Sequence, residues 1–184
     1  LKLICVPPMH LLMAIKSGMD LVSLTKFLSP SQLKFLARHA PESFIEEAIR
    51  FLIRKDFALK LYSILLALPK ESSHAYTFKK FAQKMNSECV LMKKVMEESF
   101  YELKELGLEL EKRKTKARVS DQVSKFMFTT EKERKRVQEL AENIYGADTY
   151  SFDACIAAFK DNKDLIPSEL GEIVILQKKI KALL

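Results

Sequence analysis

Tryptophan is absent from this 184-residue chain, and only four glycines and six prolines are present. All-β domains depend on many turns, and turns draw heavily on glycine and proline, so their scarcity argues against an all-β fold. Cysteine is also scarce. The three cysteines, Cys5, Cys89 and Cys155, are too few and too widely spaced for a disulfide framework. We interpret them as small buried apolar side chains and expect an intracellular, cytoplasmic protein.

Signals for membrane insertion or secretion are missing as well. No apolar run approaches the ~18 residues that a membrane-spanning helix needs. The N-terminus lacks the basic region of a signal peptide, and it begins with Leu1 rather than Met. We therefore interpret the chain as a fragment of a larger intracellular protein, whose other parts could include a catalytic domain.

The residue patterns of common active sites and metal sites are absent. The three histidines, His10, His39 and His74, fall in three different expected helices, and none has a second ligand at metal-binding spacing. The glycines are scattered, so no phosphate-binding loop is formed, and neither GxSxG nor HExxH occurs. We expect no metal, no cofactor and no enzymatic activity.

Apolar residues recur along the chain with the 3.6-residue period of amphipathic helices. The pattern predicts an all-α fold, an irregular bundle of about ten helices in which helix exceeds roughly two-thirds of the residues, well above the usual average. Two capping boxes mark helix starts, Ser29 to Gln32 and Thr130 to Glu133. Asn86 and Ser87 offer a further cap, which predicts that one helix ends near residue 85 and a long helix covers about 88–115.

The segment 57–68 is apolar almost all round, which is typical of a helix at the centre of a bundle. We predict that three of its leucines and its isoleucine are buried together with three residues of other segments: Leu61, Ile64, Leu65, Leu68, Phe44, Leu52 and Phe81. The expected domains are a main helical bundle over 1–111, a basic connector over 112–129 and a smaller C-terminal helical subdomain over 130–184. The 88–115 helix is expected to join the bundle to the subdomain.

Positive charge is concentrated in one stretch of the chain. The net charge is +7, and residues 112–136 alone hold 10 basic and 3 acidic residues, a balance of +7. The candidate anion-binding or partner-binding residues are the cations of this stretch and the two phenylalanines between them: Lys112, Arg113, Lys114, Lys116, Arg118, Lys125, Phe126, Phe128, Arg134, Lys135 and Arg136.

Two interpretations of this basic segment remain open. Clustered Lys and Arg attract phosphate groups of lipids or nucleic acid, and Phe126 and Phe128 could enter a membrane interface or stack on bases. Alternatively, the cations are a solvated end of the long helix that complements its dipole, and the phenylalanines pack onto the core. The deciding observation is whether the cations share one exposed surface that is free of acidic partners.

These features predict a non-enzymatic helical interaction module, of the adaptor or scaffold type, that binds a protein partner. The alternative is a module that binds an anionic surface through 112–136, either a phosphoinositide-containing or acidic membrane or RNA. An enzyme whose site follows no known motif is a third and weaker alternative.

Overall fold

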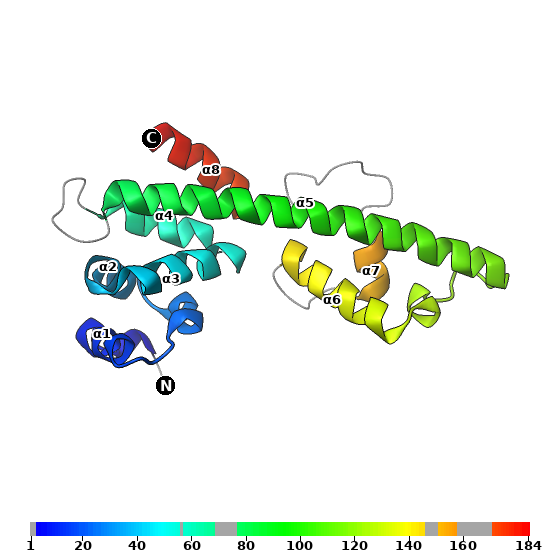
Figure 1. Cartoon of the computed structure of the whole chain (residues 1–184), viewed down its shortest axis with the longest axis horizontal. Coiled ribbons are helices and arrows are strands. Elements are labelled where there is room, and N and C mark those ends of the chain that lie inside the picture. The colour runs from blue at the N-terminus through cyan, green and yellow to red at the C-terminus, as the bar shows by residue number, and fades with distance from the viewer. Residues whose placement is uncertain (1–2, 56, 69–76, 146–150, 158–170) are drawn as a thin grey trace. The chain divides into compact units, whose positions relative to one another are not determined.

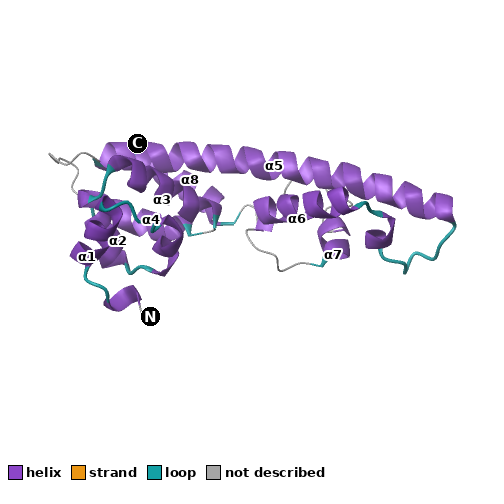
Figure 2. Ribbon diagram, turned by 60° about the horizontal axis from the view of Figure 1, so that its bottom comes forward, coloured by secondary structure: helices purple, strands orange, loops and turns teal. Residues whose placement is uncertain are grey.

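A computed structural model describes residues 3–55, 57–68, 77–145, 151–157 and 171–184. Helices make up 82% of these residues, and no strand occurs among them, as Figure 2 shows. The prediction of an all-α multi-helix fold is therefore confirmed. No helix within the described ranges combines the length and the apolar character that crossing a membrane requires.

The contacts within the chain divide it into two compact units. The first consists of residues 1–92 and 172–184, and the second of residues 93–171. This division differs from the boundaries expected at 111 and 129. One reason is that the last helix packs against α4 of the first unit instead of joining residues 130–171. The other is that residues 93–117 share a core with the helices that follow them.

The first unit contains α1 (Pro8–Lys16), the 3₁₀ helix η2 (Val22–Phe27), α2 (Pro30–His39), α3 (Glu42–Arg54), α4 (Ala58–Leu66), the start of α5 and α8 (Glu172–Leu183). A short 3₁₀ turn, η1 (Leu3–Cys5), precedes them. The core of the first unit is centred on α4, as the apolar segment 57–68 predicts. All seven residues expected in this core are buried: Leu61, Ile64, Leu65, Leu68, Phe44, Leu52 and Phe81.

Polar contacts fix the ends of these helices. Ser29 and Gln32 form the expected capping box at the start of α2, and the Gln32 amide also donates to the carbonyls of Leu3 and Val6. The Glu172 side chain accepts a hydrogen bond of 3.0 Å from the backbone N–H of Leu59. This contact places the start of α8 at the N-terminus of α4, where a carboxylate is favoured by the helix dipole.

The predicted break at residues 86–87 is wrong, because α5 runs as one helix from Phe78 to Ala117 (Figure 1). Ser87 does not act as a cap. Its hydroxyl donates to the carbonyl of Lys84 within the same helix. Met85 and Cys89 on either side are fully buried, so tertiary packing holds this stretch helical despite its local capping residues.

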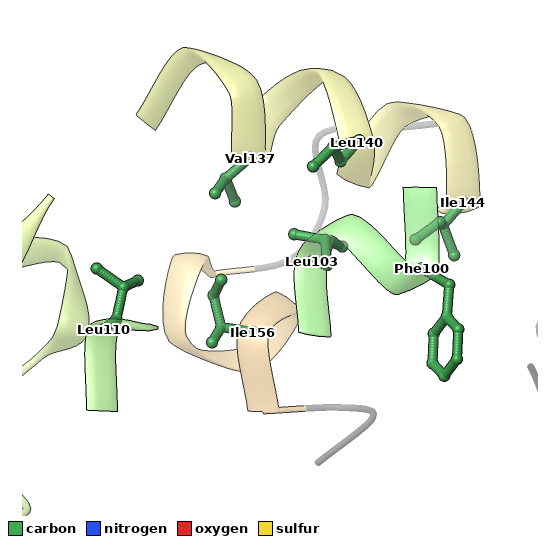
Figure 3. Close-up of a cluster of buried hydrophobic side chains, with 7 residues drawn as sticks. All are labelled: Phe100, Leu103, Leu110, Val137, Leu140, Ile144 and Ile156. Carbon is green, nitrogen blue, oxygen red and sulfur yellow. The ribbon is translucent and has the colours of Figure 1, made fainter. Parts of the chain in front are cut away.

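The second unit is built from residues 93–117 of α5, the 3₁₀ helix η3 (Lys125–Phe128), α6 (Glu131–Tyr145) and α7 (Phe152–Ala157). In Figure 3, Leu140 of α6 lies over Leu103 of α5, and Ile144 of α6 lies beside Phe100. The seven buried residues of this core cluster are Phe100, Leu103, Leu110, Val137, Leu140, Ile144 and Ile156. The 112–129 segment is therefore not all connector, because its first six residues belong to α5.

Candidate functional site

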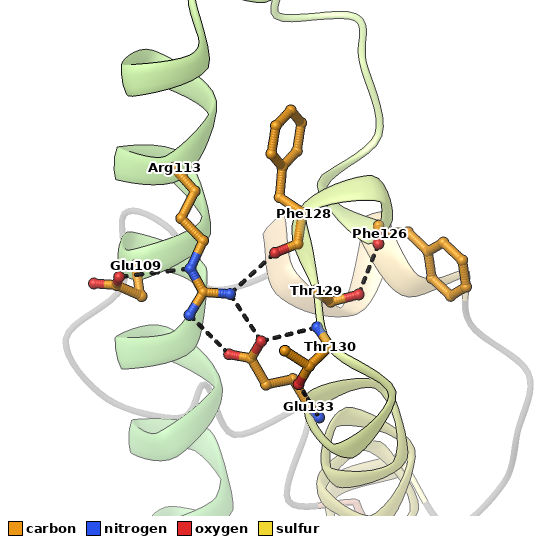
Figure 4. A network of polar contacts seen from close by, with 7 residues as sticks. All are labelled: Glu109, Arg113, Phe126, Phe128, Thr129, Thr130 and Glu133. Atoms are coloured by element: carbon orange, nitrogen blue, oxygen red, sulfur yellow. Dashed lines mark hydrogen bonds and ion pairs between the residues drawn. The ribbon is translucent and has the colours of Figure 1, made fainter.

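The basic segment 112–136 begins in the last turns of α5 and ends in the first turns of α6. Near its start, Arg113 of α5 forms two hydrogen bonds to the Glu133 carboxylate of α6, at 2.8 and 3.1 Å (Figure 4). The same guanidinium donates to the carbonyl of Phe128 at 3.0 Å and lies 3.6 Å from Glu109. This cation of the predicted site is thus held by contacts inside the unit.

Glu133 takes part in both an ion pair and a helix cap. Besides pairing with Arg113, it completes the predicted capping box of α6. Its carboxylate accepts from the N–H of Thr130 at 3.0 Å, and its own N–H donates to the Thr130 hydroxyl at 3.2 Å. The hydrogen bond from Arg113 and the one from Thr130 lower the pKa of Glu133 to about 2. The carboxylate is therefore charged at neutral pH and neutralises Arg113.

Three more cations of the segment have acidic partners. Arg136 binds Glu102 of α5 through two hydrogen bonds of 2.7 Å and also contacts Glu139 at 2.9 Å. These hydrogen bonds lower the pKa of Glu102 below its ordinary value. Two remaining ion pairs of the segment join Lys125 to Glu111 at 3.3 Å and Lys135 to Glu131 at 3.6 Å.

Two further cations and both phenylalanines make contacts within the unit, although Arg134 and Phe126 remain exposed. The Lys114 side chain is buried, and its ammonium donates to the carbonyl of Asp121 at 2.9 Å. The Arg134 guanidinium lies 4.7 Å from the centre of the Phe126 ring, a cation–π contact. Phe126 also contacts the ring of Phe152 edge-on, and Phe128 packs against the core cluster.

Of the predicted site residues, the structure leaves four cations exposed and without an acidic partner among the described residues: Lys112, Lys116, Arg118 and Arg134. Lys112 and Lys116 are four residues apart on α5 and so lie on one face of the helix. The segment's balance of +7 thus overstates its available positive charge, because half of its ten cations are paired with carboxylates or buried.

Two adjoining hollows lie beside this face of α5. The first has a volume of about 240 Å³ and is lined by Lys104, Gly107, Leu108, Glu111, Lys125 and Ile156. The second is shallow and widely open to solvent, and it is lined by residues of α5 alone: Leu108, Glu111, Lys112, Thr115 and Lys116. Both are walled by Leu108, whose side chain is 64% exposed. We call the two hollows together the α5 groove.

The α5 groove is shaped by Gly107 of α5 and Ile156 of α7, which are not among the predicted site residues. A Cβ atom at Gly107 would lie 2.9 Å from Cγ2 of Ile156, so only glycine allows α7 to approach α5 this closely. An isolated glycine inside a long helix is a signal of such packing, and it could have drawn attention to this site. Leu108 carries no comparable signal, because a single leucine on a helix is ordinary.

Other groups of chemical interest lie elsewhere in the chain. The Cys89 thiol is buried, and burial together with the neighbouring Glu88 charge raises its pKa to about 12. Such a thiol is not ionised at neutral pH and is a poor nucleophile. Among the described ranges, no three His, Cys, Asp or Glu side chains gather closely enough to hold a metal ion.

Comparisons with known protein families, with curated proteins and with solved structures give no match to this chain.

Proposed function

We propose that this chain is a non-enzymatic helical interaction module that binds a protein partner through the α5 groove. The observation that carries the proposal is Leu108, which stands 64% exposed between two hollows with Lys112 and Lys116 beside it. An apolar side chain at the centre with cations at the rim is a typical arrangement of protein-binding surfaces.

The positive charges beside the α5 groove favour an acidic partner. Lys112 and Lys116 have no acidic partner in the part of the chain that the structure describes, and Lys104 lines the same groove. An amphipathic helix with one apolar anchor and flanking Asp or Glu side chains would complement both features. The anchor would cover Leu108, and the carboxylates would pair with the two lysines.

A peptide selection tests this proposal. A display library of random peptides is panned against the full chain, and the selected peptides are measured on variants by fluorescence anisotropy. We expect them to combine an apolar residue with Asp or Glu. Covering a leucine is worth about 1.5–3 kcal/mol and every 1.4 kcal/mol is tenfold in affinity, so Leu108→Asp should weaken binding about tenfold or more.

A matched control lies on the same helix. Leu91 is 53% exposed on α5 and belongs to the first unit, so Leu91→Asp should leave the affinity unchanged. Lys112→Glu with Lys116→Glu should weaken binding at low salt and less at high salt. Selected peptides without acidic residues, or peptides that bind Leu108→Asp as tightly as wild type, would overturn the proposal.

A second candidate function is binding to an anionic surface, a lipid headgroup layer or RNA, through the basic segment. It is favoured by Met127, which is 74% exposed within η3 and lies in a segment rich in Lys and Arg. The cations that carry it would be the five without described acidic partners, Lys112, Lys116, Arg118, Lys132 and Arg134. An exposed apolar side chain among cations suits a membrane interface.

Cosedimentation with phosphatidylserine-containing vesicles, at low and high salt, tests the second candidate. Replacing the five cations with Gln should abolish binding, and Met127→Ser should weaken it, because apolar area no longer enters the interface. If the ligand is RNA, removing the cations should abolish that binding as well, because the cations contact its phosphates. No binding of the wild-type chain to either ligand at low salt would reject this candidate.

A further inference from the structure

The loop that follows α5 exposes a serine directly after the cations of the groove. The helix ends where Arg118 adopts a left-handed backbone conformation, with φ of 55°. Ser120 follows two residues later, outside any helix and exposed to solvent. Its hydroxyl oxygen accepts one weak hydrogen bond, of 3.3 Å, from the N–H of Gln122. The hydroxyl is therefore accessible to another macromolecule.

The residues before Ser120 carry the charge that one class of enzyme recognises. Arg118 and Lys116 stand two and four positions before it, and both are exposed without a described acidic partner. Basophilic protein kinases select serines that follow Arg and Lys, because acidic side chains line their substrate grooves. These kinases bind the acceptor in an extended segment. Val119 and Ser120 lie outside any helix, and only a turn, in which the Ser120 carbonyl accepts from the N–H of Val123 at 3.0 Å, would have to open.

The other hydroxyl groups of the segment are held by contacts within the unit. Ser124 donates to Asp153 at 2.5 Å, and Thr129 donates to the carbonyl of Phe126 at 2.6 Å. Thr115 lies inside α5 and donates to the carbonyl of Glu111, while Thr130 caps α6. Among the described hydroxyl groups of this basic segment, Ser120 alone combines exposure, a coil conformation and free cations before it.

We propose that Ser120 is the acceptor for a basophilic protein kinase, and that its phosphorylation weakens the binding of an acidic partner in the α5 groove. The second half rests on the proposed function. In the reaction the Ser120 hydroxyl oxygen attacks the γ-phosphorus of Mg-ATP. An O–P bond forms, the bond from the γ-phosphorus to the bridging oxygen breaks, and ADP leaves. The hydroxyl proton passes to the catalytic carboxylate of the kinase.

The effect on the groove follows from charge and distance. Phosphorylation adds a charge of about −1.5 to −2 at neutral pH. Four residues of extended chain span at most ~14 Å, and the screening length is about 30 Å at 0.01 M salt, so at low salt the phosphate would lie within one screening length of Lys116. It would lower the positive potential that attracts carboxylates to Lys112 and Lys116. It could also pair with Lys116 and Arg118 directly, which would compete with the partner.

The acceptor is tested with the full purified chain, Mg-ATP and a purified basophilic serine/threonine kinase. Intact-mass spectrometry should show the gain of one phosphate, and fragmentation should place it on Ser120. Ser120→Ala should abolish the gain, and Arg118→Gln should slow it about tenfold or more. Ser124→Ala is the matched control and should be phosphorylated as wild type. No phosphate on the wild-type chain, or a phosphate that persists in Ser120→Ala, would overturn the assignment.

The regulatory half is tested by measuring the peptides selected on the unmodified chain against the phosphorylated chain. We expect affinity to fall about five- to tenfold at low salt and the difference to shrink at high salt. Equal affinities would overturn the regulatory half. Failure of the proposed function would be seen separately, as peptides that bind Leu108→Asp as tightly as wild type. That outcome would not affect the assignment of Ser120 as the acceptor, which the mass spectra test independently.

Discussion

Arg113 and Glu133, twenty residues apart, are joined by two hydrogen bonds of 2.8 and 3.1 Å. The pair links the last turns of α5 to the first turn of α6. Glu133 also caps α6 through Thr130, so one carboxylate serves both the ion pair and the helix start. The cations of the basic segment therefore do not all serve as free positive charge, because Arg113 is one of four that are paired with carboxylates inside the second unit.

The depressed pKa of Glu133 predicts how stability depends on pH. The pKa is about 2 in the folded chain against an ordinary value of 4.5. A carboxyl whose pKa is lowered by folding contributes stability above its unfolded pKa and loses it as the pH falls toward the folded value. We expect Glu133→Gln to be less stable than wild type at neutral pH, and the difference to shrink between about pH 4.5 and pH 2.

Urea unfolding followed by circular dichroism, at a series of pH values, measures this difference. Gln still serves in a capping box, so the variant removes the charge and keeps the cap. Glu131→Gln is the control, because its ion pair with Lys135 is exposed at both ends and should add little stability. A difference between wild type and Glu133→Gln that persists unchanged to pH 2 would contradict the prediction.

Local signals in the sequence predict the parts of the fold that local contacts decide. Both capping boxes form as predicted, because the partners lie three residues apart in each. The apolar segment around Leu65 is buried at the centre of its unit for a similar reason, since a helix without a polar face has no other stable place. The break predicted at residues 86–87 is wrong because packing around Met85 and Cys89 overrides the capping tendency.

A matched pair of leucines on α4 tests the importance of this core. Leu65 is fully buried and Leu66, the next residue, is 56% exposed. Leu65→Ala should lower the free energy of unfolding by ~2–5 kcal/mol, the usual range for a buried leucine. Leu66→Ala should change it by less than ~0.5 kcal/mol, as surface substitutions do. Equal effects of the two substitutions in thermal or urea unfolding would show that α4 is not central.

The candidate site is less predictable from sequence than the fold. The clustered charge of residues 112–136 is visible in the sequence, but which cations are neutralised depends on residues far away in the chain. Arg136, for example, pairs with Glu102, 34 residues earlier. The α5 groove likewise depends on the packing of α7 against α5. Gly107 signals in the sequence that some element packs closely there, but nothing in the sequence identifies that element as α7.

The close approach of α7 to α5 at Gly107 predicts that Gly107→Ala lowers the stability of the wild-type chain but raises that of an Ile156→Ala variant. A Cβ at residue 107 would meet Cγ2 of Ile156 at 2.9 Å, and that atom sits on a branched side chain with little freedom to move. Overpacking of this kind costs ~1–3 kcal/mol, while replacing a helical glycine by alanine gains up to ~1 kcal/mol. We expect Gly107→Ala to destabilise the wild-type chain by about 1 kcal/mol. In an Ile156→Ala background Cγ2 is gone, so the same substitution should stabilise by up to ~1 kcal/mol.

A double-mutant cycle of urea unfolding measures the coupling. If Gly107→Ala has the same effect in both backgrounds, the two helices do not touch at these residues, and the wall of the α5 groove formed by Ile156 is not where the structure places it.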